Sequence, residues 1–233
     1  MSEQKKPKKN KYKAIIIGAG RIAAQFDSPN GKDVLTHAHA YRQNQKTELV
    51  GFFDINKSAA RAAAEKWGVS AFDDLEQALI ETKPDIISIC TPNHAHFSNL
   101  MEVAKHKPKI VICEKPFTSK IENAQKIIKI YKDSDIPILV NYSRRFDKAV
   151  QKLKKEIENK KYGKIICSSG IYTKGILHNG SHLVDLSRFL FGEIKDLFTF
   201  YAVNDYEKED KSVAGFLKYE NCPQFHLMVG DER

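Results

Sequence analysis

A glycine-rich turn, GAGRIA at residues 18–23, is the sharpest chemical signal in the sequence. It follows a short apolar run, and its G-x-G-x-x-A spacing is that of a dinucleotide-binding turn. In such a turn Gly18 permits the tight bend, Gly20 lets a pyrophosphate approach the backbone, and the small Ala23 lets the next helix pack closely. The amino end of that helix would add N–H donors and a partial positive charge. The pattern therefore predicts that a dinucleotide binds at Gly18, Gly20, Arg21 and Ile22.

An acid follows the next apolar run, LVGFF at residues 49–53, where a ribose-binding carboxylate belongs. This acid, Asp54, lies 34 residues after Gly20, whereas the usual separation is about 20. We attribute the difference to an insertion at residues 26–34, FDSPNGKDV. A carboxylate there favours NAD over NADP, because two like charges 4 Å apart cost ~1 kcal/mol in water and ~4 kcal/mol at a protein surface. Lys57 is close enough in sequence to soften this preference, and the alternative role for Asp54 is to cap the next helix.

Four further polar segments stand in order along the chain: TPNHAH at 91–96, EKP at 114–116, NYSRRF at 141–146 and GSHLVD at 180–185. Each of the first three directly follows an apolar run. Together with the glycine turn, this series resembles the family of glucose–fructose oxidoreductase and inositol dehydrogenase, the Gfo/Idh/MocA oxidoreductases. The resemblance covers roughly residues 12 to 200. Family members are usually longer, so we expect a C-terminally short second domain.

The resemblance implies a role for each motif. Lys115 would lie beside the reacting carbon, where its charge stabilises a developing alkoxide. His182 takes the place of the family's catalytic histidine, and a histidine pKa suits proton transfer near neutral pH. The substrate side would be formed by Arg145, His178, Asn179 and Asp185. The remaining cofactor contacts would be Thr91, Pro92, Asn93, His96, Glu114, Lys115 and Asn141.

The substrate side also departs from the family pattern. Many members carry an acid four residues before the catalytic histidine, where this chain has His178. The histidine pair could bind a polyol, serve a different proton path, or reflect lost dehydrogenase chemistry. We expect no metal there, because Asn179 and Gly180 disfavour a helix that would align the pair and no third ligand stands out. Arg144 and Arg145 could hold an anionic substrate or make ordinary ion pairs, and both readings stay open.

The elements that position these residues alternate in the first part of the chain. Continuous apolar strands joined by helices predict a parallel sheet covered on both faces. We expect an α/β Rossmann domain over residues 14–142. Its strands are predicted at 14–17, 49–53, 85–90, 109–113 and 136–140, and its helices at 57–67, 74–80, 97–105 and 121–131.

Beyond residue 142 the pattern predicts a truncated α+β domain, 143–233, with a mostly antiparallel sheet. Helices are expected at 147–159 and 182–191, and strands at 164–172, 197–203, 213–219 and 225–229. We expect Trp67 and the aromatic residues of this second domain to be core. The open face of its sheet is a possible homo-oligomer contact, weakened by the truncation. Four histidines are expected to be structural or surface residues: His37, His39, His106 and His226.

Composition places few further limits on function. The 233 residues are 42% hydrophobic and 29% charged, which is ordinary for a soluble globular protein. The four cysteines are far apart and are expected to be reduced and mostly buried. No apolar run reaches the length of a membrane span and the first residues lack an apolar signal segment, so we expect a cytoplasmic protein. Residues 1–13 carry +5 of the net charge of +9, which favours a basic flexible tail over a nucleic-acid-binding arm.

The sequence thus predicts an NAD-dependent oxidoreductase that moves a hydride between nicotinamide and a carbinol carbon of a sugar, polyol or nucleotide-linked sugar. No nucleic-acid or membrane partner is expected. The rival is a non-catalytic NAD- or sugar-binding regulatory relative, which the departure at His178 and the short C-terminus favour. Against that rival, Lys115 and His182 are both present. A methyltransferase lacks any motif beyond the glycine turn.

Overall fold

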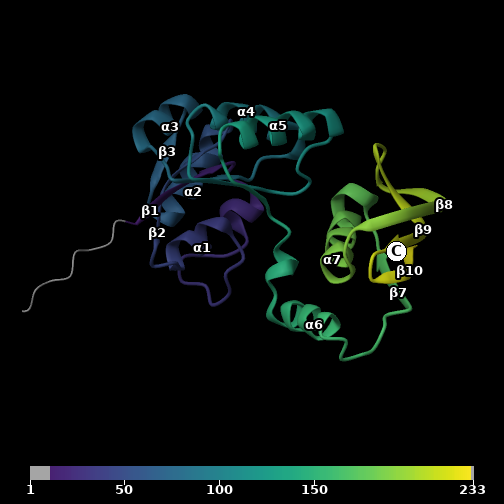
Figure 1. Ribbon diagram of the computed structural model, residues 1–233. Helices are drawn as coiled ribbons and strands as arrows, with labels where there is room; N and C mark the ends of the chain where they lie inside the picture. Colours follow the sequence, from purple (N-terminus) through teal and green to yellow (C-terminus); the bar gives the residue numbers. More distant parts are fainter. Residues whose placement is uncertain (1–10, 232–233) are drawn as a thin grey trace, which may run out of the picture. The chain divides into compact units, whose positions relative to one another are not determined.

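The computed structural model describes residues 11–231, which form two compact units divided between Asn141 and Tyr142 (Figure 1). Most of the expected tail, residues 1–10, lies outside the described residues. Tyr12 and Lys13, also assigned to the tail, already belong to the first strand, β1 (Tyr12–Ile17). Their side chains are exposed while their backbones pair with the neighbouring strand, so the hydrophobic pattern does not reveal them.

The first unit is built on a six-stranded sheet in the order β3-β2-β1-β4-β5-β6, with every neighbouring pair parallel. After β1 the strands are β2 (Thr47–Phe53), β3 (Ser70–Phe72), β4 (Ile86–Ile89), β5 (Ile110–Cys113) and β6 (Ile138–Val140). The order reverses at β1, whose neighbours are β2 and β4. In open sheets of this kind ligands bind beyond the carboxyl ends of the strands at such a reversal.

Helices cover both faces of this sheet, as the apolar strands predict. Ile15 and Ile17 of β1 face one core cluster, while Ala14 and Ile16 face the other. The first cluster is completed by α3 (Leu75–Thr82), α4 (Asn93–Ala104) and α5 (Ile121–Asp133), and the second by α1 (His37–Gln43) and α2 (Lys57–Trp67). Trp67 is 1% exposed in the second cluster, so its expected core position is confirmed.

Three local features differ from the sequence expectation. The helix after the glycine turn is only a five-residue π-helix, η1 (Arg21–Gln25), because the turn-rich insertion follows directly. α4 begins at Asn93, four residues earlier than expected, so Asn93 and His96 are helical. The short edge strand β3 was not expected, since three residues carry too little periodicity to register.

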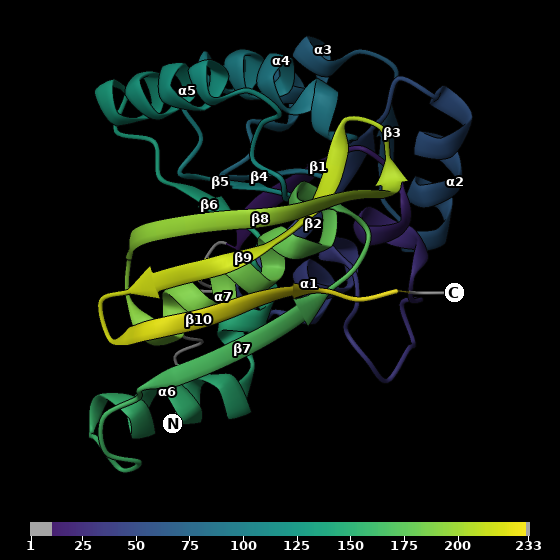
Figure 2. The ribbon, with the colours of Figure 1, turned by 90° about the vertical axis from the view of Figure 1, so that its right-hand side faces the viewer.

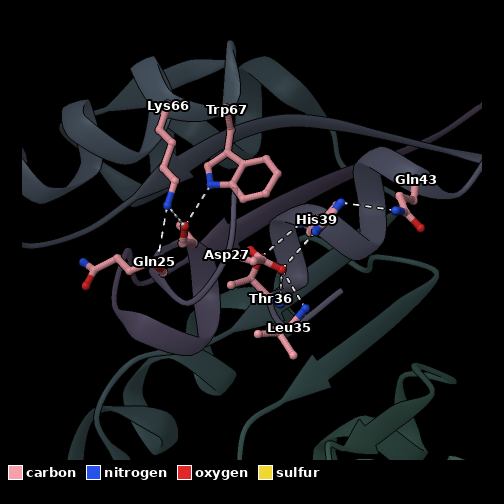
Figure 3. A network of polar contacts seen from close by, with 9 residues as sticks. Gln25, Asp27, Leu35, Thr36, His39, Gln43, Lys66 and Trp67 are labelled. Carbon is pink, nitrogen blue, oxygen red and sulfur yellow. Dashed lines mark hydrogen bonds and ion pairs between the residues drawn. The ribbon is translucent and has the colours of Figure 1, made fainter. Parts of the chain in front are cut away.

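The insertion is a closed loop anchored by Asp27 (Figure 3). The Asp27 carboxylate accepts hydrogen bonds from the backbone N–H groups of Leu35 (2.6 Å) and Thr36 (3.0 Å), and from Thr36 Oγ1 (2.6 Å). It also contacts His39 Nδ1 at 3.0 Å, and the two side chains are only 4% and 1% exposed. Directly before the loop, at the C-terminal end of η1, Lys66 Nζ and Trp67 Nε1 both donate to the Ala24 carbonyl at 3.0 Å. The loop is therefore tied to both α1 and α2.

The second unit pairs a four-stranded sheet with a long helix. The sheet order is β7-β10-β9-β8, in which β7 and β10 are parallel and the other pairs antiparallel. Figure 2 shows the four strands side by side with α7 behind them. The elements in chain order are η2 (Ser143–Phe146), α6 (Lys148–Glu158), β7 (Cys167–Tyr172), η3 (Gly175–Gly180), α7 (Ser181–Phe191), β8 (Ile194–Glu207), β9 (Asp210–Tyr219) and β10 (Cys222–Val229).

Two expectations for this unit need correction. The aromatic residues were expected to be core, which holds for those on the face toward α7, such as Phe191, Tyr219 and Phe225, but not for those on the opposite face. Phe198 and Phe200 are 63% and 59% exposed, because strand residues alternate between faces and these strands carry aromatic side chains on both. Residues 175–180 form a π-helix continuous with α7, although Asn179 and Gly180 were expected to disfavour a helix.

Within residues 11–231, no helix is long and apolar enough to cross a membrane.

Replacing Asp27 with alanine should destabilise the first unit by about 3 kcal/mol, because it removes the acceptor of the buried Thr36 and His39 side chains. Urea unfolding of the full chain measures this. The matched control is Asp33→Ala in the same loop, where the side chain is exposed and the expected change is within about 0.5 kcal/mol. Equal stabilities for the two variants would contradict the anchoring role.

The same anchor gives a pH dependence with a definite sign. Burial alone would raise the pKa of Asp27, but hydrogen bonds from Thr36, Leu35 and His39 outweigh it and hold the pKa below its ordinary value. The stability contributed by the carboxylate is therefore fully present above the ordinary aspartate pKa and is lost as the pH falls through the lowered pKa. The difference in free energy of unfolding between wild type and Asp27→Ala, measured by urea unfolding at a series of pH values, should therefore become smaller in that acid range.

Candidate cofactor- and substrate-binding sites

The strand register of the first unit brings the predicted cofactor motifs to one edge of the sheet. Ile17 pairs with Ile89, Ile89 with Cys113, and Cys113 with Val140. The residues that follow these strand ends therefore emerge at the same level. They are Gly18, Cys90, Glu114 and Asn141, and Asp54 follows Phe53, the partner of Ile17, on the other side.

The two glycines of the turn are required for different reasons. Gly18 has φ of +97°, and a Cβ there would lie 2.7 Å from the Cys90 carbonyl group, so only glycine fits against β4. Gly20 has φ of −77°, which any residue adopts, and a Cβ there would meet no neighbouring protein atom within 4 Å. The open space beside Gly20 suits a pyrophosphate approaching the backbone, so the turn fits a dinucleotide.

Asp54 is attached to the glycine turn. Its Oδ2 accepts a hydrogen bond from the Ala19 N–H at 2.7 Å, and its Oδ1 accepts one from Asn56 N–H at 2.8 Å. The cap of α2 is Asn56, whose side chain accepts from Ala59 N–H. The alternative role of Asp54 as helix cap therefore belongs to Asn56. Lys57, expected to soften the acid's charge, pairs with Asp73 at 3.4 Å.

The TPN segment divides into exposed and internal residues. Pro92 and Asn93 are exposed at the start of α4. Thr91 Oγ1 accepts a hydrogen bond from Asn99 Nδ2 at 3.1 Å. His96 is 1% exposed, and its ring nitrogens lie 2.9 Å from the Pro116 carbonyl oxygen and 2.8 Å from that of Thr91. His96 therefore joins the TPN and EKP segments to each other, and cofactor contact by this group stays a prediction.

Glu114 and Asn141 also bond within the protein. Glu114 Oε1 lies 2.9 Å from His37 Nε2 and accepts a hydrogen bond from Asn141 Nδ2 at 2.6 Å. Burial alone would raise the pKa of Glu114, but the bonds from His37 and Asn141 outweigh it and lower that pKa. Sequence reasoning missed the link to His37, because 77 residues separate the two and no spacing indicates the contact.

In the second unit, Asp185 binds Arg145 in a forked ion pair. Arg145 Nε donates to Oδ2 at 2.7 Å, and Nη2 donates to Oδ1 at 2.5 Å. The hydrogen bond to Asp185 raises the pKa of Arg145, although partial burial opposes it. Of the two readings left open for Arg145, the structure places it in an ion pair, and a substrate contact stays a prediction. His182 lies one turn before Asp185, with the Tyr142 ring edge-on to its own at 5.8 Å.

The segment that carries His178 and Asn179 is held by the β8–β9 hairpin. The Asp210 carboxylate accepts hydrogen bonds from the backbone N–H groups of Leu177 and His178, each at 2.8 Å. Asp205 accepts from Lys174 N–H at 2.8 Å, and the Tyr206 ring stacks on His178 at 4.7 Å. Sequence reasoning named none of these hairpin residues, because the contacts join positions about 30 apart. Among the described residues, no three His, Cys, Asp or Glu side chains are placed to hold a metal ion.

An open parallel sheet with a glycine turn after β1 and an acid after β2 defines the first unit as a dinucleotide-binding Rossmann domain. The chain belongs to the GFO_IDH_MocA family, the oxidoreductase family with an NAD-binding Rossmann fold, whose model matches residues 12–142. The expected family and fold class are thereby confirmed.

Two curated relatives illustrate the similarity. The D-glucoside 3-dehydrogenase of Escherichia coli K12 is 27% identical over 226 residues, covering 91% of this chain and 61% of the relative. The inositol 2-dehydrogenase of Rhizobium meliloti is 29% identical over 198 residues, covering 76% of this chain and 54% of the relative. The chain therefore spans less than two thirds of the length of these relatives.

Solved structures share the fold of the chain. The WlbA dehydrogenase from Bordetella pertussis, in complex with NADH and UDP-GlcNAcA, superimposes with a TM-score of 0.81 at 22% identity. The match covers 96% of this chain and 69% of that one. An oxidoreductase from Agrobacterium radiobacter, in complex with NAD⁺, L-tartaric acid and magnesium, gives 0.79 at 17% identity, covering 96% and 67%.

The contrast between the two glycines yields a matched pair of variants. Gly20→Ala should fold with a stability within about 0.5 kcal/mol of wild type, yet lose at least about tenfold in NADH affinity because the methyl group occupies the open space. Gly18→Ala should be strongly destabilised by its clash with Cys90. Thermal shift with and without NADH separates the two effects, since ligand at a hundred times its Kd adds ~2.7 kcal/mol. Wild-type NADH binding by Gly20→Ala would exclude the turn as the pyrophosphate site.

Proposed function

We propose that this chain catalyses hydride transfer between NAD and a carbinol carbon of a sugar, polyol or nucleotide-linked sugar. The observation that carries the proposal is the position of Lys115. It directly follows Glu114 at the carboxyl edge of the sheet, the edge that also bears the glycine turn. The family and the names of the relatives, glucoside and inositol dehydrogenases, support the same substrate class.

Oxidation of the alcohol breaks its C–H and O–H bonds and forms a carbonyl group. NAD supplies the acceptor for the hydride, which carries the electron pair of the C–H bond. The proton of the hydroxyl passes to His182, acting as general base. The ammonium group of Lys115 stabilises the negative charge that develops on the oxygen. Arg145, His178, Asn179 and Asp185 are proposed to line the substrate side.

NAD is proposed over NADP because of Asp54. The carboxylate is fixed by its hydrogen bonds to the turn N–H of Ala19 and to Asn56, so it cannot turn away cheaply from a 2′-phosphate. Lys57 forms an ion pair with Asp73, so less of its positive charge is left to offset the negative charge of Asp54. Repulsion of ~1 to ~4 kcal/mol corresponds to a preference of about fivefold to several hundredfold. Gly18, Gly20, Arg21, Ile22, Thr91, Pro92, Asn93, His96, Glu114 and Asn141 complete the proposed cofactor environment.

All four cysteines are free, and only Cys167 is exposed. Free thiols persist in a reducing compartment, and we place the protein in the cytoplasm.

The test is an assay of the purified chain with NAD⁺ and a panel of inositols, hexoses and nucleotide sugars. We expect NADH absorbance to grow with at least one substrate, about tenfold faster with NAD⁺ than with NADP⁺. The growth should vanish in Lys115→Ala and in His182→Ala, while both variants still bind NADH. NADH binding without turnover of any substrate would instead support the regulatory rival, which the histidine at position 178 favours.

The open face of the second sheet is proposed to bind a second copy of this chain. Phe198, Phe200 and Phe216 form an aromatic row, with ring centroids 6.4 and 5.3 Å apart, and the His226 ring lies edge-on to Phe216 at 4.8 Å. Phe216 is 46% exposed, so the row is an apolar surface that self-association would bury.

Self-association through this face should be weak and concentration-dependent, as the sheet has four strands among residues 11–231. Sedimentation of Phe200→Asp should show a monomer at concentrations where the wild type associates. Ile55→Asp is the control, because Ile55 is 92% exposed but lies in the other unit. A tight tetramer at all concentrations, or equal behaviour of the two variants, would contradict the proposal.

A further inference from the structure

A buried chain of hydrogen bonds runs through the first unit and ends beside Lys115. Tyr41 OH lies 2.6 Å from Ser88 Oγ, and Ser88 Oγ lies 2.9 Å from His37 Nδ1. His37 Nε2 lies 2.9 Å from Glu114 Oε1, which also accepts from Asn141. Tyr41, Ser88 and His37 are 7%, 0% and 8% exposed. Buried polar groups in such a chain each need a partner, so their arrangement is tightly specified.

The direction of the hydrogen bond between His37 and Glu114 follows from the charge of the carboxylate. The pKa of Glu114 is lowered, so its carboxylate is ionised and can only accept hydrogen bonds. His37 Nε2 must therefore be the donor. Burial raises the pKa of Tyr41, so its hydroxyl keeps its proton. The contact between Ser88 Oγ and His37 Nδ1 and the contact between His37 Nε2 and Glu114 give both ring nitrogens of His37 a hydrogen-bond partner.

Glu114 links this hydrogen-bonded chain to the backbone of Lys115. Its backbone N–H donates to the Ile89 carbonyl at 2.9 Å, which fixes it to the end of β4. Its carboxylate accepts a hydrogen bond from the backbone N–H of Lys115. The lysine backbone is thus held through Glu114 by α1, by β4 and by the segment after β6. A flexible lysine side chain presents its ammonium group reproducibly only when its backbone is fixed, and an error of 1 Å can cost about a hundredfold in rate.

We propose that His37 is a positioning residue for Lys115: its Nε2–H holds the Glu114 carboxylate against the Lys115 backbone. This assignment rests on the proposed function, in which Lys115 stabilises the alkoxide. If His37 served only for packing, polar replacements of similar size should have equal activity. If His37 positions Lys115, their activities should differ according to where their amide donor lies.

Two amide variants test this difference. The Nε2 of His37→Gln can occupy the place of the imidazole Nε2 and donate to Glu114. The Nδ2 of His37→Asn lies near the place of Nδ1 and reaches Ser88 but not Glu114. We expect His37→Asn to lose about 10- to 100-fold in kcat with KM for NAD⁺ and sugar little changed, and His37→Gln to restore kcat to within about threefold of wild type. Equal kcat values for the two variants would overturn the proposal.

Ser88→Ala controls for stability. It also removes a buried hydrogen bond of His37 but leaves the bond to Glu114, so a fall in melting temperature without a fall in kcat is expected. A loss of kcat in Ser88→Ala equal to that in His37→Asn would show that the effect follows stability, and would overturn the positioning role.

A second readout needs no turnover. The Lys115 N–H is the donor to Glu114, so its hydrogen exchange reports the bond directly. Exchange should be at least about tenfold faster in His37→Asn than in His37→Gln, with NADH binding by thermal shift unchanged in both. If the wild type turns over no substrate, the proposed function fails while this comparison still decides the position of Lys115. If His37→Asn does not fold, wild-type exchange in His37→Gln supports the proposal and fast exchange overturns it.

Discussion

The close approach of β1 and β4 is the constraint on which the cofactor side of this protein depends. Gly18 leaves β1 in a left-handed conformation directly against the Cys90 carbonyl, where no side chain has room. That contact directs the turn over the sheet edge and leaves open space at Gly20. It also places the Ala19 N–H within reach of Asp54. Because the strands are paired in parallel register, Glu114 and Asn141 follow their strands at the same edge of the sheet as Gly18.

The first unit contains two buried carboxylates, Glu114 and Asp27, and each accepts several hydrogen bonds. Glu114 accepts from His37, Asn141 and the Lys115 backbone, and Asp27 accepts from Leu35, Thr36 and His39. In both cases the hydrogen bonds outweigh desolvation and keep the acid ionised. His37 and His39 both lie in the first turn of α1, so this turn contacts both the insertion and the segment that carries Lys115.

In the second unit, too, carboxylates accept backbone hydrogen bonds, here from the segment 174–180 that carries His178. Asp210 and Asp205 come from the β8–β9 hairpin and accept the backbone N–H groups at the start of η3. Gly175 has φ of +76°, and a Cβ there would lie 2.2 Å from the Asp210 carboxylate, so glycine is needed for this approach. The hairpin thus serves two purposes: one end orders residues 174–180, and the exposed aromatic row of its open face offers the apolar surface proposed for self-association.

The sequence by itself determined the alternation of strands and helices, the glycine turn, the acid after β2 and the family, because these depend on local periodicity and on motifs at strand ends. It also located the insertion at residues 26–34 from an irregular spacing. It did not reveal that His37 binds Glu114, that His96 joins two motifs, or that Asp205, Tyr206 and Asp210 hold the His178 segment. Nor did it separate the two faces of the second sheet. Those features arise from contacts between residues that only the folded chain brings together, since hydrogen bonding across such distances leaves no periodic trace in the sequence.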